Sequence, residues 1–176
     1  MAILPILKFP DPRLGQKSAP VKQFDERLKQ LCADMLETMY GAPGIGLAAP
    51  QVNVHQCVVV IDIDYETPEE NPGEIINPAP RIFINPKIIS KNGEILFQEG
   101  CLSVPGTYEE VLRAEAVVVE YQDLDGNPHK LEAEGLLAVA IQHELDHLEG
   151  RLFIDRLSFV KSKAVKRRIL KGESET

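Results

Sequence analysis

The spacing of apolar residues near the N-terminus predicts an amphipathic helix. Within residues 24–40, FDERLKQLCADMLETMY, apolar side chains recur every three or four positions, as one face of a helix requires. This stripe consists of Phe24, Leu28, Leu31, Met35 and Met39. Gly41, Pro43 and Gly44 follow at once, and we expect them to end the helix.

The middle of the chain contains the short β-branched runs that are typical of strands. Residues 57–64 (CVVVIDID), 81–90 (RIFINPKIIS) and 94–104 (EILFQEGCLSV) each predict a strand. Residues 114–135 predict a β-hairpin around the turn sequence DGNP. The acidic, proline-rich segment 65–80 lies between the first two strands and predicts a surface excursion.

Two further helices are predicted toward the C-terminus. Residues 136–150, LLAVAIQHELDHLEG, are mostly Ala, Leu and Ile, so this helix should be largely buried and end at Gly150. A second helix, 159–171, should begin after Ser158 as its N-cap. This order predicts an α+β fold in which mostly antiparallel strands pack around a central helix, with a helix near each terminus. The length predicts a single domain over residues 1–176.

Composition and charge narrow the class of protein. The chain is 44% hydrophobic and 26% charged, without a run long enough to span a bilayer, which is typical of a globular protein. The N-terminus lacks the features of a signal peptide, so we expect the cytoplasm. The three cysteines have no disulfide-like spacing and should be thiols, or one of them a metal ligand.

The net charge of −8 is unevenly distributed. Residues 156–171 carry seven basic residues and no acid, which leaves −15 on the rest of the chain. A basic helix on an acidic body predicts a contact with an anionic partner such as RNA. A solvated helix face is the alternative interpretation.

The sequence HELDH, residues 143–147, carries the strongest chemical signal. His143 and His147 are four positions apart, so they share one face of a helix and can hold one metal ion. Glu144 can then work on a water molecule at the metal without binding the ion. The alternative is a helix face whose histidines meet only water or hydrogen-bond partners. Asp146 can accept a hydrogen bond from a ligand histidine or an arginine, or it can face solvent.

A catalytic metal site usually has three protein ligands and one open position. No histidine follows His147, which excludes the extended metzincin motif, and His55 and His129 lie in turn-like contexts. Cys101, in QEGCLSVPG, is the best candidate, because Gly100 before it lets the backbone approach closely where a strand ends. A buried thiol that packs as a small hydrophobe is the alternative for Cys101.

Three motifs together resemble the signature of peptide deformylases of the bacterial type. They are GIGLAAPQ (44–51), EGCLS (99–103) and HELDH (143–147), and the similarity runs along most of the chain. The resemblance implies a metal-dependent hydrolase that removes the N-formyl group from the formyl-methionine of nascent polypeptides and releases formate. It thus implies a catalytic domain that acts on a linear formamide bond.

The resemblance also implies a ligand set and a mechanism. Cys101, His143 and His147 would bind one divalent ion, natively Fe(II), for which zinc, nickel or cobalt can substitute. Metal-bound water would attack the formyl carbon, with Glu144 as general base and then general acid. The oxyanion would be stabilised by the metal and by two donors, the side-chain amide of Gln51 and the backbone N–H of Leu102.

Residues around these motifs are predicted to bind the substrate. Gly44 and Gly46 bracket Ile45, so a substrate backbone can run alongside as an added strand. We also expect Gly46 to be one of the catalytic residues. Gly100 is expected to border the same site. The methionine side chain needs an apolar slot, for which the candidates are Ile45, Phe97, Leu136, Val139 and Ala140. Plain core packing is the alternative for each of the five.

The stretch after EGCLS departs from the family pattern. Many bacterial members carry an arginine there, near the substrate mouth, whereas this chain has Tyr108, Glu109 and Glu110 before Arg113. The preference of this chain for substrate residues beyond the methionine can therefore differ from that of those members. Arg113 can pair with Glu99 and brace the cysteine loop, or it can lie on the surface.

Two other functions compete with deformylation. A metalloprotease that cuts internal peptide bonds shares the H-E-x-x-H pattern, but Cys101 as third ligand argues against it. A metal-stabilised module that binds ribosomes through residues 159–171 is the second, although structural metal sites normally have four protein ligands. We expect a ribosome contact near the exit tunnel, and neither a membrane nor a DNA partner.

Overall fold

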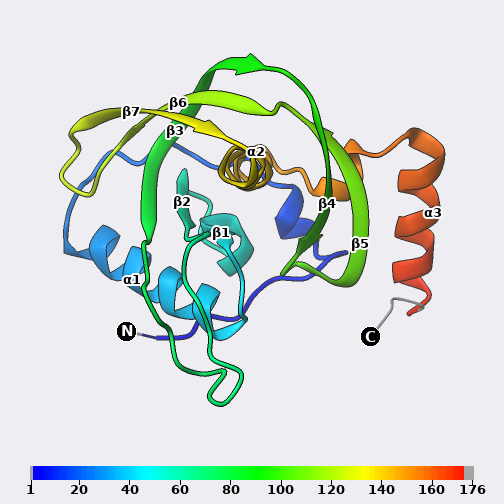
Figure 1. The fold of residues 1–176 in the computed structure, drawn as a ribbon, viewed down its shortest axis with the longest axis horizontal. Helices are drawn as coiled ribbons and strands as arrows, with labels where there is room; N and C mark the ends of the chain where they lie inside the picture. Colours follow the sequence, from blue (N-terminus) through cyan, green and yellow to red (C-terminus); the bar gives the residue numbers. More distant parts are fainter. Residues whose placement is uncertain (1, 173–176) are drawn as a thin grey trace.

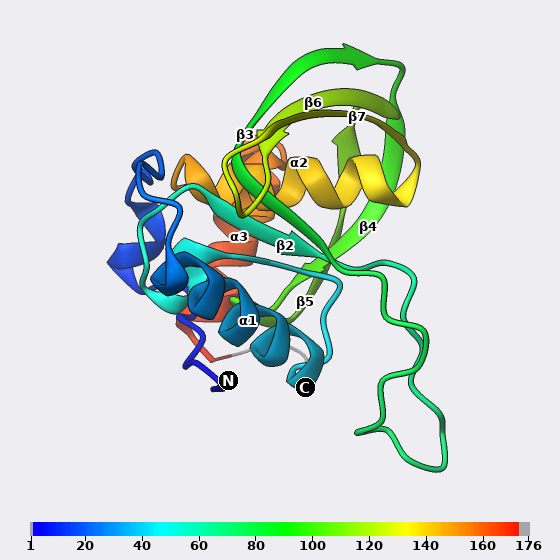
Figure 2. The ribbon, with the colours of Figure 1, turned by 90° about the vertical axis from the view of Figure 1, so that its left-hand side faces the viewer.

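The computed structural model describes residues 2–172 and has an α+β fold, as predicted (Figures 1 and 2). Three α-helices and seven strands occur in the order α1 (Glu26–Gly41), β1 (Gly46–Ala48), β2 (Val58–Ile61), β3 (Arg81–Asn92), β4 (Ile95–Cys101), β5 (Val104–Arg113), β6 (Ala116–Gln122), β7 (Pro128–Glu134), α2 (Leu136–Leu148) and α3 (Phe159–Leu170). Short 3-10 helices cover Pro12–Gly15, Ala49–Val52 and Phe153–Arg156.

All strand pairs between these elements are antiparallel, and they form two sheets. The larger sheet has the order β1-β2-β3-β6-β7, and β4 pairs with β5 in a separate two-stranded sheet. Figure 1 looks along α2 and shows the strands curving around it. β1 is an edge strand of the larger sheet, so one side of its backbone has no partner strand within the described residues.

The core is built on both faces of β2, whose four residues are all buried. Successive side chains of a strand point to opposite faces. Val58 and Val60 therefore pack with the buried stripe of α1, whereas Val59 and Ile61 pack with α2 and with Phe83 of β3. Burying each such side chain contributes about 1.5–3 kcal/mol, which fixes α2 between the strands.

The ends of the predicted elements shift by up to three residues, and one strand was missed. α1 begins at Glu26 because Asp25 caps it, accepting a hydrogen bond from the Leu28 N–H (3.1 Å). The predicted strand 94–104 ends at Cys101. β5 was not predicted, because Gly106, Glu109 and Glu110 give this segment the composition of a loop. An exposed two-stranded hairpin nevertheless tolerates such residues.

The segment between β2 and β3 projects from the body, as predicted (Figure 2). A single bridge, Glu66 to Ile76, joins its two arms. Gly150, with a φ of 74°, follows α2 and confirms the predicted helix end. All three cysteines are free thiols. Within residues 2–172, no helix combines the length and the apolar character that a membrane crossing requires.

Candidate metal and active site

A sulfur and two imidazoles converge where β4 ends against α2. One ligand atom from each of Cys101, His143 and His147 lies within 4.8 Å of the others. The Cys101 Sγ is 3.5 Å from the His147 Nε2, and both imidazoles are buried. One thiolate and two imidazoles are a donor set that suits a transition metal, so these residues fit a divalent ion. The structure thus brings together the three predicted ligands.

Glu99 fixes which nitrogen of His143 is available for a metal. The His143 Nδ1 is 2.7 Å from the Glu99 Oε1, and a proton on Nδ1 leaves the lone pair of Nε2 for the ion. Arg113 donates to both oxygens of Glu99, at 2.8 and 2.9 Å. The expected pairing of Arg113 with Glu99 is therefore confirmed, and the surface alternative for Arg113 is wrong, because the residue is buried.

The charge network continues through α2 to the surface. Asp146 accepts hydrogen bonds from Arg113 (2.7 Å) and from Arg156 (2.6 Å). Burial alone would raise the pKa of the Glu99 carboxyl, but hydrogen bonds from Arg113 and His143 outweigh it and lower that pKa. The pKa of Asp146 is lowered in the same way, against burial, chiefly by Arg156. Each buried charge in this network thus has an opposite partner.

Glu144 is a buried carboxylate with a free oxygen beside the ligand set. Its Oε1 has no hydrogen-bond partner among the described residues, and burial raises its pKa to about 7. A Cβ at position 46 would lie 2.5 Å from the Glu144 Oε2, so any side chain there would displace the Glu144 carboxylate. A carboxylate in such a position is suited to exchanging protons near neutral pH.

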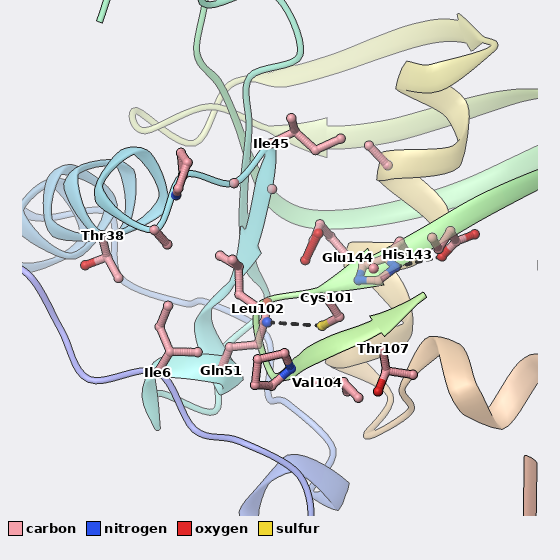
Figure 3. Close-up of a pocket in the computed structure, with 18 of the residues that line it drawn as sticks. Ile6, Thr38, Ile45, Gln51, Cys101, Leu102, Val104, Thr107, His143 and Glu144 are labelled. Atoms are coloured by element: carbon pink, nitrogen blue, oxygen red, sulfur yellow. Dashed lines mark hydrogen bonds and ion pairs between the residues drawn. The ribbon is translucent and has the colours of Figure 1, made fainter. Parts of the chain in front are cut away.

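The Gln51 amide is held with its NH₂ group toward the ligand set. The Ala48 N–H donates to the Gln51 Oε1 at 2.9 Å, which leaves the Nε2 to donate to the Ser103 Oγ (3.0 Å). The same Nε2 is 3.7 Å from the Cys101 Sγ (Figure 3). The 3-10 helix Ala49–Val52 carries Gln51 into this position directly after β1.

A cavity of about 910 Å³ opens beside the ligand set, a size typical of ligand sites. Its lining includes every predicted substrate-binding and catalytic residue: Gly44, Ile45, Gly46, Gln51, Phe97, Gly100, Leu102, Leu136, Val139, Ala140 and Glu144. Gly44 lies against Leu102, and Gly100 against Tyr108: an added Cβ would meet their side chains at 2.8 and 2.6 Å. These glycines therefore keep the cavity walls close together.

Some residues of the site had no signal in the sequence. The N-terminal residues Ile3 to Ile6 belong to no periodic pattern, and Ser103, which accepts from Gln51, lies in EGCLS but had no predicted role. Glu99 was predicted to pair with Arg113, but its contact with His143 was not predicted. His55 and His129 lie elsewhere, bound to the Arg13 carbonyl and to Asp123, as their turn-like contexts predicted.

Comparisons with known proteins agree with this arrangement. The family model described as polypeptide deformylase matches residues 3–163. "Peptide deformylase 2" of Xanthomonas axonopodis is 52% identical over 174 residues, which are 97% of this chain and 96% of that protein. "Peptide deformylase" of Chromobacterium violaceum is 51% identical over 175 residues, covering 99% of both.

Solved structures give the same result. A peptide deformylase from Legionella pneumophila superposes with a TM-score of 0.85 at 45% identity and covers 98% of this chain and 96% of its own. The enzyme from Ehrlichia chaffeensis in complex with actinonin gives a TM-score of 0.85 at 38% identity, covering 98% and 99%. The comparisons of sequence and of fold thus agree with the resemblance of the three motifs, and the chain belongs to the polypeptide deformylase family.

Proposed function

We propose that this chain removes the N-formyl group from the N-terminal formyl-methionine of nascent polypeptides and releases formate. One observation carries the proposal: ligand atoms of Cys101, His143 and His147 lie within 4.8 Å of one another, beside the open carboxylate oxygen of Glu144. Membership of the deformylase family supports the same reaction. We further propose that residues 1–176 act as a single catalytic domain, of which residue 1 and residues 173–176 lie outside the described structure.

The three ligands would hold one divalent ion, and we propose Fe(II) as the native one. When bound, the ion supplies Lewis acidity toward the formyl carbonyl and lowers the pKa of water. Thiolate and Fe(II) both oxidise, so activity should fall in peroxide and survive when nickel replaces iron. Metal analysis of anaerobically purified protein, paired with a formate assay, tests this choice. An iron-loaded enzyme that is indifferent to peroxide would contradict it.

The other residues of the site would bind the substrate, stabilise the oxyanion and transfer the proton. The substrate backbone would lie along the free edge of β1, with its methionine side chain against Phe97, Val139 and Ala140. The Gln51 amide and the Leu102 N–H would donate to the oxygen of the formyl group as charge develops on it. Glu144 would accept a proton from the attacking water and return it to the leaving amine.

Formate release from formyl-Met-Ala-Ser tests the reaction directly. Glu144→Gln should retain the metal and lose turnover by at least about a hundredfold. A metal-stabilised binding module would lose nothing by this change. An internally quenched peptide without a formyl group separates the deformylase from a protease: cleavage of that peptide, with no formate from formyl-Met-Ala-Ser, would refute the proposal.

We propose in addition that α3 contacts the ribosome in the cytoplasm, where formylated chains emerge. Four of the seven basic residues of segment 156–171 form ion pairs with acids of the body: Arg156, Lys161, Lys166 and Arg168. Exposed Lys163, Arg167 and Lys171 have no ion pair within the described residues, and exposed Phe159, Val160 and Leu170 accompany them on α3.

Reversing the unpaired charges tests the ribosome contact. Lys163→Glu, Arg167→Glu and Lys171→Glu together should weaken binding to ribosomes, and the wild-type affinity should fall steeply with salt. The control reverses three exposed cations on β3 and β7: Lys87, Lys91 and Lys130. Salt-insensitive binding, or equal loss in both triple variants, would count against α3 as the docking element.

A further inference from the structure

The projecting segment between β2 and β3 is bonded to a wall of the cavity. The hydroxyl of Tyr65, the first residue of segment 65–80, donates a hydrogen bond to the Gly44 carbonyl at 2.7 Å. Gly44 lines the cavity, whereas Tyr65 lies outside the three sequence motifs and is not part of the lining. This contact therefore joins a surface excursion to the proposed active site.

A buried carboxylate fixes the two ends of this segment to the body. Asp62 is 1% exposed, follows β2 and accepts a hydrogen bond from the Tyr40 hydroxyl at 2.7 Å. It also accepts from three backbone N–H groups, those of Asp64 (2.9 Å), Tyr65 (3.2 Å) and Ala79 (2.8 Å). Burial would raise the pKa of the Asp62 carboxyl, but these hydrogen bonds outweigh it and lower that pKa. Residues near both ends of the segment thus share one charged acceptor.

The Tyr65 side chain also packs against α1. Its ring meets the Tyr40 ring edge to face, with the centroids 4.8 Å apart and an angle of 82° between the planes. Burial and the neighbouring Asp62 charge raise the pKa of the Tyr65 hydroxyl, so it keeps its proton at neutral pH. The hydroxyl is therefore a donor whose position is set by α1 and by the end of β2.

Gly44 depends on its backbone contacts, because it has no side chain to hold it. Its N–H donates to the Met39 carbonyl in the last turn of α1 (2.7 Å), and its carbonyl accepts from Tyr65. Gly44 also packs against Leu102, since a Cβ at position 44 would lie 2.8 Å from the Leu102 Cδ1. Without the Tyr65 hydroxyl, Gly44 would lose one of its two polar contacts, and its packing against Leu102 would loosen.

We propose that Tyr65 is a positioning residue for the deformylation reaction. By holding the Gly44 carbonyl, it keeps Gly44 packed against Leu102, whose N–H is one of the two proposed donors to the oxyanion. The proposal rests on the proposed function, which assigns that role to Leu102. Tyr65 acts through these two residues and is not itself a catalytic residue.

Tyr65→Phe tests the proposal, because it removes the hydroxyl and keeps the ring. Complete loss of an oxyanion donor costs about a hundredfold or more in kcat, so a donor that is only loosened should cost less. With the metal-loaded enzyme and formyl-Met-Ala-Ser, kcat should fall about fivefold and KM should change less than about twofold, since the oxyanion forms only in the transition state. An unchanged kcat, or a loss confined to KM, would overturn the proposal.

Tyr40→Phe is the matched control. It removes the other tyrosine hydroxyl of this cluster, which donates to Asp62 and not to Gly44. Each variant loses one hydrogen bond and should lose a similar free energy of unfolding in urea, but Tyr40→Phe should keep kcat within about twofold of the wild type. An equal loss of kcat in both variants would show that Tyr65 only supports the fold.

A double-mutant cycle tests the path through Leu102. Leu102→Ala removes the side chain that packs against Gly44 and keeps the backbone N–H. In this background Tyr65→Phe should lower kcat by less than about twofold, because the link from Gly44 is already broken. If Tyr65→Phe keeps its full effect on kcat in this background, Tyr65 does not act through Leu102 and the proposal fails.

Backbone relaxation gives a readout that does not depend on turnover. In the zinc-loaded protein, the NMR order parameters of the Gly44 and Leu102 N–H groups should fall from about 0.85 toward about 0.6 in Tyr65→Phe and stay high in Tyr40→Phe. If the wild-type enzyme releases no formate from formyl-Met-Ala-Ser, the proposed function fails, and this measurement still decides whether Tyr65 fixes Leu102. Unchanged order parameters in Tyr65→Phe would refute that role.

Discussion

The two C-terminal helices, α2 and α3, differ in where their charged residues lie: those of α2 are mostly buried, and those of α3 are mostly exposed. α2 is buried on most of its length, and two of its ionisable groups are matched inside the protein: Asp146 by two arginines and His143 by Glu99. α3 is mostly exposed and contributes only Ser162 and Val165 to the buried interior. Ion pairs of similar length thus occur in two environments. Burial, rather than the presence of an ion pair, decides how much each one matters.

Arg113→Met should have the largest effect on stability. Among residues 2–172, Arg113 is the only cation that contacts both Glu99 and Asp146, and both acids are at least nine-tenths buried. Glu99 would keep only His143 and Asp146 only Arg156, and removing one partner of a buried ion pair costs about 3–5 kcal/mol. Urea unfolding measures the loss, with the exposed Arg27→Met as control. A cost near that of the control would show that burial does not set the value of these pairs.

Removing the metal should have the next largest effect, and it should affect α2 much more than α3. An ion present at a thousandfold its Kd stabilises the folded state by about 4 kcal/mol, which chelation would remove. Because the ligands belong to α2 and to the end of β4, amide exchange should accelerate there and change little in α3. Equal acceleration in both helices would contradict a local role for the metal site.

The sequence predicted α2 and its metal-binding motif well. Histidines four apart on a helix must share a face, and the apolar run before them requires burial, so the pair and α2 followed from periodicity. Cys101 was the best candidate for the third ligand from its place after Gly100, and the resemblance of three motifs implied the same ligand and Gln51 as a donor. The fold class followed from the order of the elements.

Contacts between distant segments could not be predicted in this way. The N-terminal residues Ile3 to Ile6 have no period, and only the folded chain brings them beside Gln51. The sequence left open whether Asp146 meets a ligand histidine, an arginine or solvent, and the two arginines that bind it lie 33 positions before it and 10 after it. β5 was missed because its exposed face has the composition of a loop.

Val165→Ala should have a moderate effect, limited to α3. Val165 is 3% exposed and packs with Phe153 and Ile154. The change removes two methyl-sized groups at about 0.8 kcal/mol each, so about 1.5 kcal/mol should be lost. Circular dichroism during urea unfolding measures the loss, and Ala164→Gly at an exposed position of α3 separates packing from helix propensity, which costs about 1 kcal/mol. Unchanged turnover of formyl-Met-Ala-Ser would confirm that α3 is not part of the catalytic site.

Lys161→Met should have the smallest effect and gives the closest contrast with Arg113→Met. The Lys161 Nζ is 3.2 Å from Glu109, but 53% of the lysine side chain is exposed, so water and salt screen the pair. Less than about 1 kcal/mol should be lost, and the loss should shrink as salt is added. A double-mutant cycle with Glu109→Gln isolates the pair from the second contact of Glu109, with Arg168 at 3.9 Å. A coupling energy as large as the cost of Arg113→Met would show that exposure does not weaken these bridges, because α3 would then be held by its charges rather than by Val165.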